Sequence, residues 1–215
     1  MAIAGSATGA VVGEVQTVAV DGQGALRFTE IEHKYVLDAT CDTEAFRRAV
    51  TALGPTRHSA LRVRDRYFLT DAGMRLGFIL RHRHDRELHE LTLKTFGADA
   101  QVRGEINVAL TPVDQDGIVD AFVDAQGVVW RGELWKVLDV WYFADCEVVY
   151  YVAEAEGRQV RCVEFEAVGA ATVEDALQTM ARYERATGFD GARRTPASLV
   201  ELMWPGALAG RRLGA

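Results

Sequence analysis

Apolar and polar residues alternate along most of the chain. The alternation is clear over residues 28–37, 61–70, 75–84, 90–94, 101–110, 128–143, 146–155 and 158–168. Side chains two positions apart in a strand point to the same face, so this spacing predicts eight β-strands, each with two chemically different faces.

Four segments interrupt the alternation and favour helix. Asp42 and Thr172 are candidate N-caps, because their side-chain oxygens can accept a hydrogen bond from the first helical turn. Helices are predicted over residues 42–54, 114–127, 172–188 and 196–203. Many strands and few helices indicate an α+β fold with a sheet large enough to close on itself.

The composition narrows the class of protein and its location. The chain has 215 residues, of which 49% are apolar and 26% are charged, as in an ordinary globular domain. We expect one domain over residues 28–215, with residues 1–27 forming a tail or an extra strand. The three cysteines are scattered and form no Cys-x-x-Cys pair, which favours free thiols in a reducing cytoplasm.

The net charge limits the partners. Acidic residues number 31 and basic residues 24, so the formal charge is -7. A net-acidic chain lacks the cationic surface that nucleic acid requires, although a local cationic pocket for a small polyanion is compatible with it. No stretch approaches the roughly 20 apolar residues that span a bilayer, so no membrane partner is expected.

Several predicted strands carry charged residues at every second position. Carboxylates dominate the first and last of these strands, and arginine and lysine dominate the middle ones. The charged side chains are Glu30, Glu32, Lys34, Arg62, Arg64, Arg66, Arg81, Arg83, Lys94, Arg103, Glu105, Glu164 and Glu166. They can form the solvated outer face of an antiparallel sheet. The grouping of the signs favours the alternative, in which they line the inside of a closed sheet.

A lumen with both signs of charge points to phosphate chemistry. Unpaired buried charges cost several kcal/mol each, so the lumen must hold water, ion pairs, metal ions or a highly charged ligand. Arginine and lysine suit phosphate oxygens, and glutamate oxygens hold Mg²⁺ or Mn²⁺. The expected ligand is therefore a small molecule with a phosphate chain and a divalent metal.

An ordered set of short motifs runs along the chain. These are EIEHK at residues 30–34, YFLTD at 67–71, LRHR at 80–83, LTLK at 91–94, RGE at 103–105, Lys136, VEFE at 163–166 and SLVELM at 198–203. The set resembles the CYTH, or triphosphate tunnel metalloenzyme, superfamily. That resemblance implies an eight-stranded antiparallel β-barrel tunnel with flanking helices. Members of the superfamily include inorganic tripolyphosphatases, thiamine triphosphatases and a class of adenylyl cyclases.

The resemblance also implies roles for individual residues. Metal ligands for Mg²⁺ or Mn²⁺ would be Glu30, Glu32, Glu105, Glu164 and Glu166. The substrate-binding cations would be Arg81, Arg83, Lys94, Arg103 and Lys136, and we add Arg64, which can either line the tunnel or form outer ion pairs. Lys34, together with the Glu32 carboxylate, would act on the attacking water. The expected function is hydrolysis of a triphosphate compound, and a homodimer is a family expectation.

Three departures from the family pattern leave other functions open. Asn107 stands where a second acid is usual, Leu138 where an arginine follows Lys136, and residues 147–154 lack an aspartate. The alternatives are a non-catalytic or altered-substrate barrel that binds phosphate compounds, an adenylyl cyclase, and an enzyme acting on another phosphorylated small molecule.

Other reactive side chains are assigned to structural roles. His82 and His84 alternate with Arg83 and should face away from a tunnel. Asp65 lies between arginines and is interpreted as an outer charge. Cys162 has no histidine partner in the sequence, which argues against a thiol nucleophile. The aromatic run 141–143 is interpreted as outer-face packing under a helix.

Overall fold

The structure is a computed structural model that describes residues 29–96, 101–111 and 113–208. The predicted N-terminal tail or extra strand, residues 1–27, lies outside these ranges. In chain order the elements are β1 (Thr29–Val36), α1 (Thr43–Ala52), β2 (Arg57–Thr70), α2 (Asp71–Leu76), β3 (Phe78–His84), β4 (His89–Thr95), β5 (Val102–Ala109), α3 (Asp116–Asp124), β6 (Val128–Tyr142), β7 (Cys146–Ala155), β8 (Arg158–Ala167), α4 (Val173–Thr187) and α5 (Leu199–Met203).

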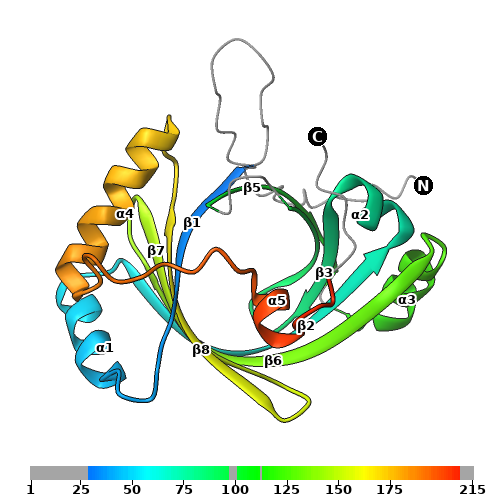
Figure 1. The fold of residues 1–215 in the computed structure, drawn as a ribbon, viewed down its shortest axis with the longest axis horizontal. Coiled ribbons are helices and arrows are strands. Elements are labelled where there is room, and N and C mark those ends of the chain that lie inside the picture. Colours follow the sequence, from blue (N-terminus) through cyan, green and yellow to red (C-terminus); the bar gives the residue numbers. More distant parts are fainter. Residues whose placement is uncertain (1–28, 97–100, 112, 209–215) are drawn as a thin grey trace, which may run out of the picture.

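The strands form a closed antiparallel barrel in the order β1-β5-β4-β3-β2-β6-β7-β8 (Figure 1). The predicted α+β barrel with flanking helices is therefore confirmed. Its longest ladder joins β2 to β6, from the pair Arg57 and Tyr142 to the pair Thr70 and Val128. Closure pairs every strand on both sides, so the barrel has no open sheet edge.

Helices α1 and α4 cover one side of the barrel (Figure 1). Phe46 of α1 and Met180 of α4 pack with outward side chains of the sheet such as Trp141 and Phe165. Helix α4 begins at the predicted cap Thr172, whose hydroxyl accepts from the backbone N–H of Asp175, and ends at Gly188 with a φ of 83°. Its apolar stripe therefore explains why β1 and β8 turn their charged faces inward.

Helices α3 and α5 cover different parts of the barrel. Helix α3 lies on the outside, where Val119 and Val123 pack on Phe68 and Leu80. Helix α5 lies within the outline of the barrel in Figure 1. Its residue Leu199 belongs to the same apolar cluster as the inward side chains of β2 and β6. Helix α5 therefore closes part of the interior.

Helix α2 was not predicted from the sequence. It begins at Thr70, whose hydroxyl caps the N–H of Gly73, and ends at Gly77 with a φ of 77°. With 6 residues it is too short to show a helical period. Among the helices of the described ranges, none is long and apolar enough to cross a membrane.

Candidate functional site

A cavity of about 710 Å³ runs inside the barrel. Inward side chains of all the charged strands line it, because alternate residues of each strand point to the barrel axis. The predicted site residues in its lining are Glu30, Glu32, Lys34, Arg81, Arg83, Lys94, Arg103, Lys136, Glu164 and Glu166. Glu105 lies beside this lining, with Oε2 2.6 Å from the Nζ of Lys94.

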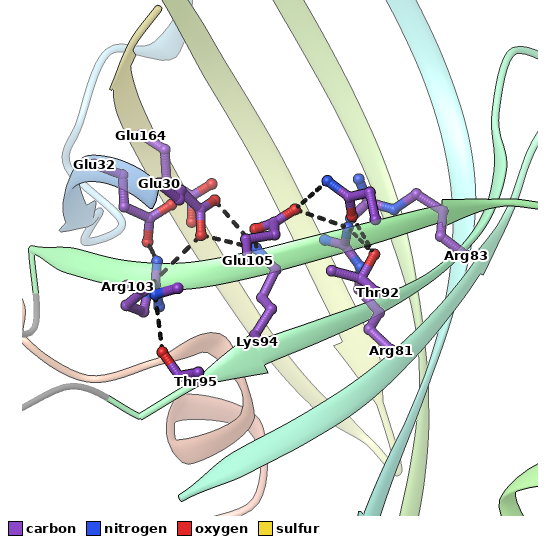
Figure 2. Close-up of polar contacts among 12 residues, drawn as sticks. Glu30, Glu32, Arg81, Arg83, Thr92, Lys94, Thr95, Arg103, Glu105 and Glu164 are labelled. Atoms are coloured by element: carbon purple, nitrogen blue, oxygen red, sulfur yellow. Dashed lines mark hydrogen bonds and ion pairs between the residues drawn. The ribbon is translucent and has the colours of Figure 1, made fainter. Parts of the chain in front are cut away.

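Acids and bases alternate along one side of the cavity and form a chain of ion pairs (Figure 2). Lys34 begins it, with Nζ 3.1 Å from Glu164 and 3.0 Å from Glu32. Arg103 contacts the same Glu32 carboxylate and lies 3.6 Å from Glu30. These groups are mostly buried, so each charge is stabilised by its neighbours and not by water.

The chain continues through Lys94 to the arginines of β3. Lys94 donates to both oxygens of Glu30, at 3.1 and 3.0 Å. Arg81 then lies 3.9 Å from Glu105 and donates to Glu90 at 2.8 Å. Glu90 was not among the predicted residues, although it shares the inward face of β4 with Thr92 and Lys94.

Burial and neighbouring charges shift the pKa values of two carboxyl groups in the cavity, Glu30 and Glu166, in opposite directions. Burial alone would raise the pKa of Glu30, but the charges of Lys94 and Arg103 outweigh it and hold that pKa well below its usual range. Glu166 behaves differently. Burial, followed by repulsion from Glu30 and Glu147, raises the pKa of Glu166 well above its usual value. Glu166 therefore lies where negative charge is in excess.

A second polar cluster corrects the interpretation of Asp65. This side chain is fully buried, and its carboxylate holds Arg83 at 2.7 and 2.8 Å and Lys136 at 2.8 Å. Asp65 points inward because it shares its face with Val63 and Tyr67, which are buried too. The sequence signal for the inward position of Asp65 was therefore that it shares its parity with these two apolar residues. Burial, and then the positive charge of Arg83, lowers the pKa of Lys136 to about 8.

The same parity places Arg64 outside the tunnel, so the expected substrate-binding position of Arg64 is wrong. Its guanidinium donates to Asp116 of α3 at 2.7 Å and to Glu133 of β6 at 2.8 Å. Arg66 likewise contacts Asp116, at 3.4 Å. The acids of α3 neutralise these arginines on the outer surface.

Three further side chains of the cavity lining were not predicted. Tyr151 donates to Glu164 at 2.7 Å. Glu147 lies opposite Glu166 in the ladder between β7 and β8 and supplies an acid on the strand that lacks an aspartate. Tyr142 also lines the cavity, and the Cζ of Arg57 lies 3.9 Å from the centre of its ring. The outer-face interpretation is therefore wrong for this member of the aromatic run.

The carboxylates suit a hard divalent cation in their chemistry. Glu30, Glu32, Glu164 and Glu166 present only oxygen ligands to one cavity, as Mg²⁺ and Mn²⁺ prefer. A cation would offset both the burial and the repulsion from Glu30 and Glu147 that raise the pKa of Glu166. Within residues 29–96, 101–111 and 113–208, however, no three such groups lie close enough to hold one ion. Most of these carboxylates are instead paired with lysine or arginine.

The histidines of β3 and β4 lie outside the cavity lining, as expected for His82. His89 donates from Nδ1 to the carbonyl of Thr111 at 2.6 Å, and in a neutral imidazole with this tautomer the Nε2 accepts, here from the Nε2 of His82 at 2.9 Å. His82 is then neutral, with Nδ1 3.5 Å from the guanidinium of Arg66 and 3.6 Å from Asp116. His84 stacks on His89 and completes the cluster.

This cluster predicts a loss of stability in mild acid. Burial is the main cause that lowers the pKa of His82 to about 4, below the value of about 6.5 of an unfolded histidine. The unfolded chain therefore binds more protons between these values, and the free energy of unfolding falls as the pH drops from 6.5 towards 4. Denaturant titrations across this range should show that the wild type loses more stability than His82→Gln. The comparison between the two proteins removes the opposite contribution of Glu166, whose raised pKa adds stability as the pH drops. An equal slope in both proteins would contradict the assignment.

Comparisons with known proteins support the fold. No family model matches the chain, and no curated protein matches it. Among solved structures, the PH1012 protein from Pyrococcus horikoshii has a TM-score of 0.63 and 17% identity, over 81% of this chain and 99% of that chain. A Bacillus halodurans protein provisionally named an adenylate cyclase has a TM-score of 0.53 and 17% identity, over 81% and 97% of the two chains.

A third similar structure is a Hippeastrum protein. It is provisionally named an adenylyl cyclase and is described as having a dominant triphosphatase activity. Its TM-score is 0.53 at 15% identity, over 84% of this chain and 99% of that chain. Identities this low show a shared fold and leave the activity to be argued from the site. The resemblance indicated by the motifs is therefore confirmed at the level of the fold.

Proposed function

We propose that this protein is a divalent-metal-dependent hydrolase of small molecules that carry a triphosphate, and that it belongs to the triphosphate tunnel superfamily. The observation that carries the proposal is the chain of alternating acids and bases inside a closed barrel. Planar guanidinium groups and lysine ammonium groups are the usual protein partners of phosphate oxygens. Inorganic tripolyphosphate, thiamine triphosphate and nucleoside triphosphates are the candidate substrates.

Binding would exchange one set of ion pairs for another. The cations that would hold phosphate oxygens are Lys34, Arg81, Arg83, Lys94, Arg103 and Lys136. As phosphate replaces carboxylate at these cations, the carboxylates become free for Mg²⁺ or Mn²⁺. The ligands for the metal would be Glu30, Glu32, Glu105, Glu164 and Glu166. The bound metal would supply charge neutralisation to the phosphate chain.

Hydrolysis then needs a water in line with the terminal phosphorus. Lys34 and Glu32 are 3.0 Å apart and both line the cavity, so they can hold that water between a donor and an acceptor. Phosphoryl transfer requires little covalent help from the protein, and positioning and charge stabilisation supply most of the rate.

One assay tests this proposal. Phosphate and pyrophosphate release would be measured from tripolyphosphate, thiamine triphosphate and ATP, with Mg²⁺, with Mn²⁺ and with a chelator. Metal-dependent release of phosphate is the expected result. Pyrophosphate together with cyclic AMP would indicate the cyclase alternative. Absence of turnover with all three compounds in both metals would contradict the proposal.

Glu164→Gln tests the acidic part of the site. Glu164 accepts from Tyr151 at 2.7 Å and lies 3.1 Å from Lys34, so an amide alters both contacts and removes a metal ligand. We expect about a tenfold or larger fall in phosphate release and a higher metal concentration at half-maximal rate. Glu154→Gln, on the exposed side of β7, is the matched control and should leave both unchanged. Equal behaviour of the two variants would exclude Glu164 from the site.

A non-catalytic phosphate-binding barrel is the second candidate. It is favoured by the pairing of the carboxylates with cations and by Asn107, which hydrogen-bonds Glu105 and Thr92 where a second acid was expected. Binding of tripolyphosphate without turnover would support it. The cytoplasmic location, the homodimer and the absence of a nucleic-acid partner stay predictions.

A further inference from the structure

The cavity has two chemically different sides. The charged arc is formed by inward side chains of β8, β1, β5, β4 and β3, which are consecutive in the barrel. The apolar arc is formed by inward side chains of β2, β6 and β7, which are also consecutive. Its members are Leu61, Val63, Leu138, Val140 and Val149.

The apolar arc is continuous across its three strands. Leu61 is paired with Leu138 between β2 and β6, and Val140 is paired with Val149 between β6 and β7. The charged groups on the same strands lie at the two ends of this apolar surface. Asp65 neutralises Lys136 at one end, and Arg57 and Glu147 line the cavity at the other, on either side of Tyr142 in the sheet. An unbroken apolar surface therefore faces the charged arc across the cavity.

Packing against α5 accounts for only part of this surface. Leu199 and Val200 of α5 cluster with the apolar arc, yet the arc and these two residues all line the cavity. Beyond them the cavity continues to Arg57 and Tyr142. A phosphate chain gains nothing from contact with valine and leucine, whereas an apolar group gains by leaving water.

We propose that the cavity binds triphosphates that are esterified with an aliphatic group. The aliphatic group lies against Leu61, Val140 and Val149, and the phosphate chain lies along the charged arc. This inference rests on the proposed function and narrows its substrate class. Small-molecule sites commonly combine a mostly apolar wall with a few polar groups that fix orientation. The departure at Leu138 then has a physical role, because it extends the apolar arc.

Calorimetric titration with methyl, butyl and octyl triphosphate and with tripolyphosphate tests the inference. The titrations would be done in chelator and again with Ca²⁺. We expect affinity to rise about twofold with each added methylene, which is half the free energy of complete burial, because the alkyl chain contacts the cavity wall on one side. Octyl triphosphate should then bind about a hundredfold more tightly than methyl triphosphate. Val140→Asn should reduce this ratio to nearly one. Val137→Asn, at a position of β6 that is 59% exposed, should keep it.

The outcomes separate this inference from the proposed function. Equal affinity of the wild-type protein for all the esters and tripolyphosphate would overturn the inference and leave the triphosphate site standing. Tighter binding of ATP than of octyl triphosphate would also overturn it, in favour of an aromatic group. Failure of every triphosphate to bind would overturn both. The wild-type series decides between these results even if Val140→Asn does not fold.

Discussion

Replacing Asp65 by asparagine is expected to destabilise the protein by about 3–5 kcal/mol, which is the usual cost of removing one partner of a buried ion pair. The carboxylate is fully buried and serves two cations, Arg83 through both oxygens and Lys136 through one. An amide of the same shape cannot compensate either charge. For a chain of this size the midpoint of thermal unfolding should fall by about 6–20 °C.

Thermal and denaturant unfolding of Asp65→Asn at neutral pH would measure this loss. The charges of Arg83 and Lys136 outweigh burial and hold the pKa of Asp65 well below its usual value, so its contribution is complete above about pH 4 and declines only in stronger acid. Asp124→Asn is the control, because Asp124 pairs with Arg131 at 2.6 Å on the exposed surface. We expect that change to cost less than about 1 kcal/mol. Similar costs for both variants would remove Asp65 from the core of the tunnel.

The elements of the fold followed from the sequence because strand periodicity is a local property. Alternation identified the eight strands, and caps such as Thr172 identified the longer helices. Helix α2 was missed because a single capped turn between two strands has no period of its own. The closure of the sheet was inferred less directly, from the number of strands and the grouping of charge signs, and the resemblance then specified an eight-stranded barrel. Periodicity could not supply this, since it describes each strand without its neighbours.

Site residues could be predicted on those strands for which the sequence indicated which face lies inside the barrel. On β1 the charged face lies inside, because Ile31 and Tyr35 pack under α4. On β2 the sense is reversed. Arg64 and Arg66 of this strand face outward, where both meet Asp116 of α3, and Asp65 faces inward. Alternation separates the two faces of a strand but does not reveal which face a distant helix covers.

The pairing of charges across the cavity lay beyond the sequence for a related reason. Lys94 and Glu30 are separated by 64 positions and meet because β4, β5 and β1 are neighbours in the barrel. Ion pairs of this kind depend on strand order and register, which residue types alone do not specify. The motifs therefore identified the members of the site but not their partners.

Replacing Lys94 by methionine is expected to weaken tripolyphosphate binding by about 10- to 100-fold, the value of one charge-assisted hydrogen bond. The Nζ of Lys94 lies 3.0 Å from Glu30 and 2.6 Å from Glu105, at the middle of the chain of ion pairs. Methionine keeps the length and apolar stem of the side chain and removes its charge. The loss of affinity has two causes. A partner of the phosphate oxygens disappears, and two carboxylates are left to repel the phosphate chain.

Calorimetric titration of Lys94→Met with tripolyphosphate in chelator would measure the change without turnover. The dependence of the dissociation constant on salt should also become weaker, since one cation fewer contacts the polyanion. Arg64→Met is the matched control, because Arg64 lies on the outer surface with Asp116 and Glu133. Its affinity should stay within about twofold of the wild type, because surface charges at that distance are largely screened. A loss in Arg64→Met that equals the loss in Lys94→Met would mean that the polyanion binds outside the barrel, and the tunnel would then not be the site.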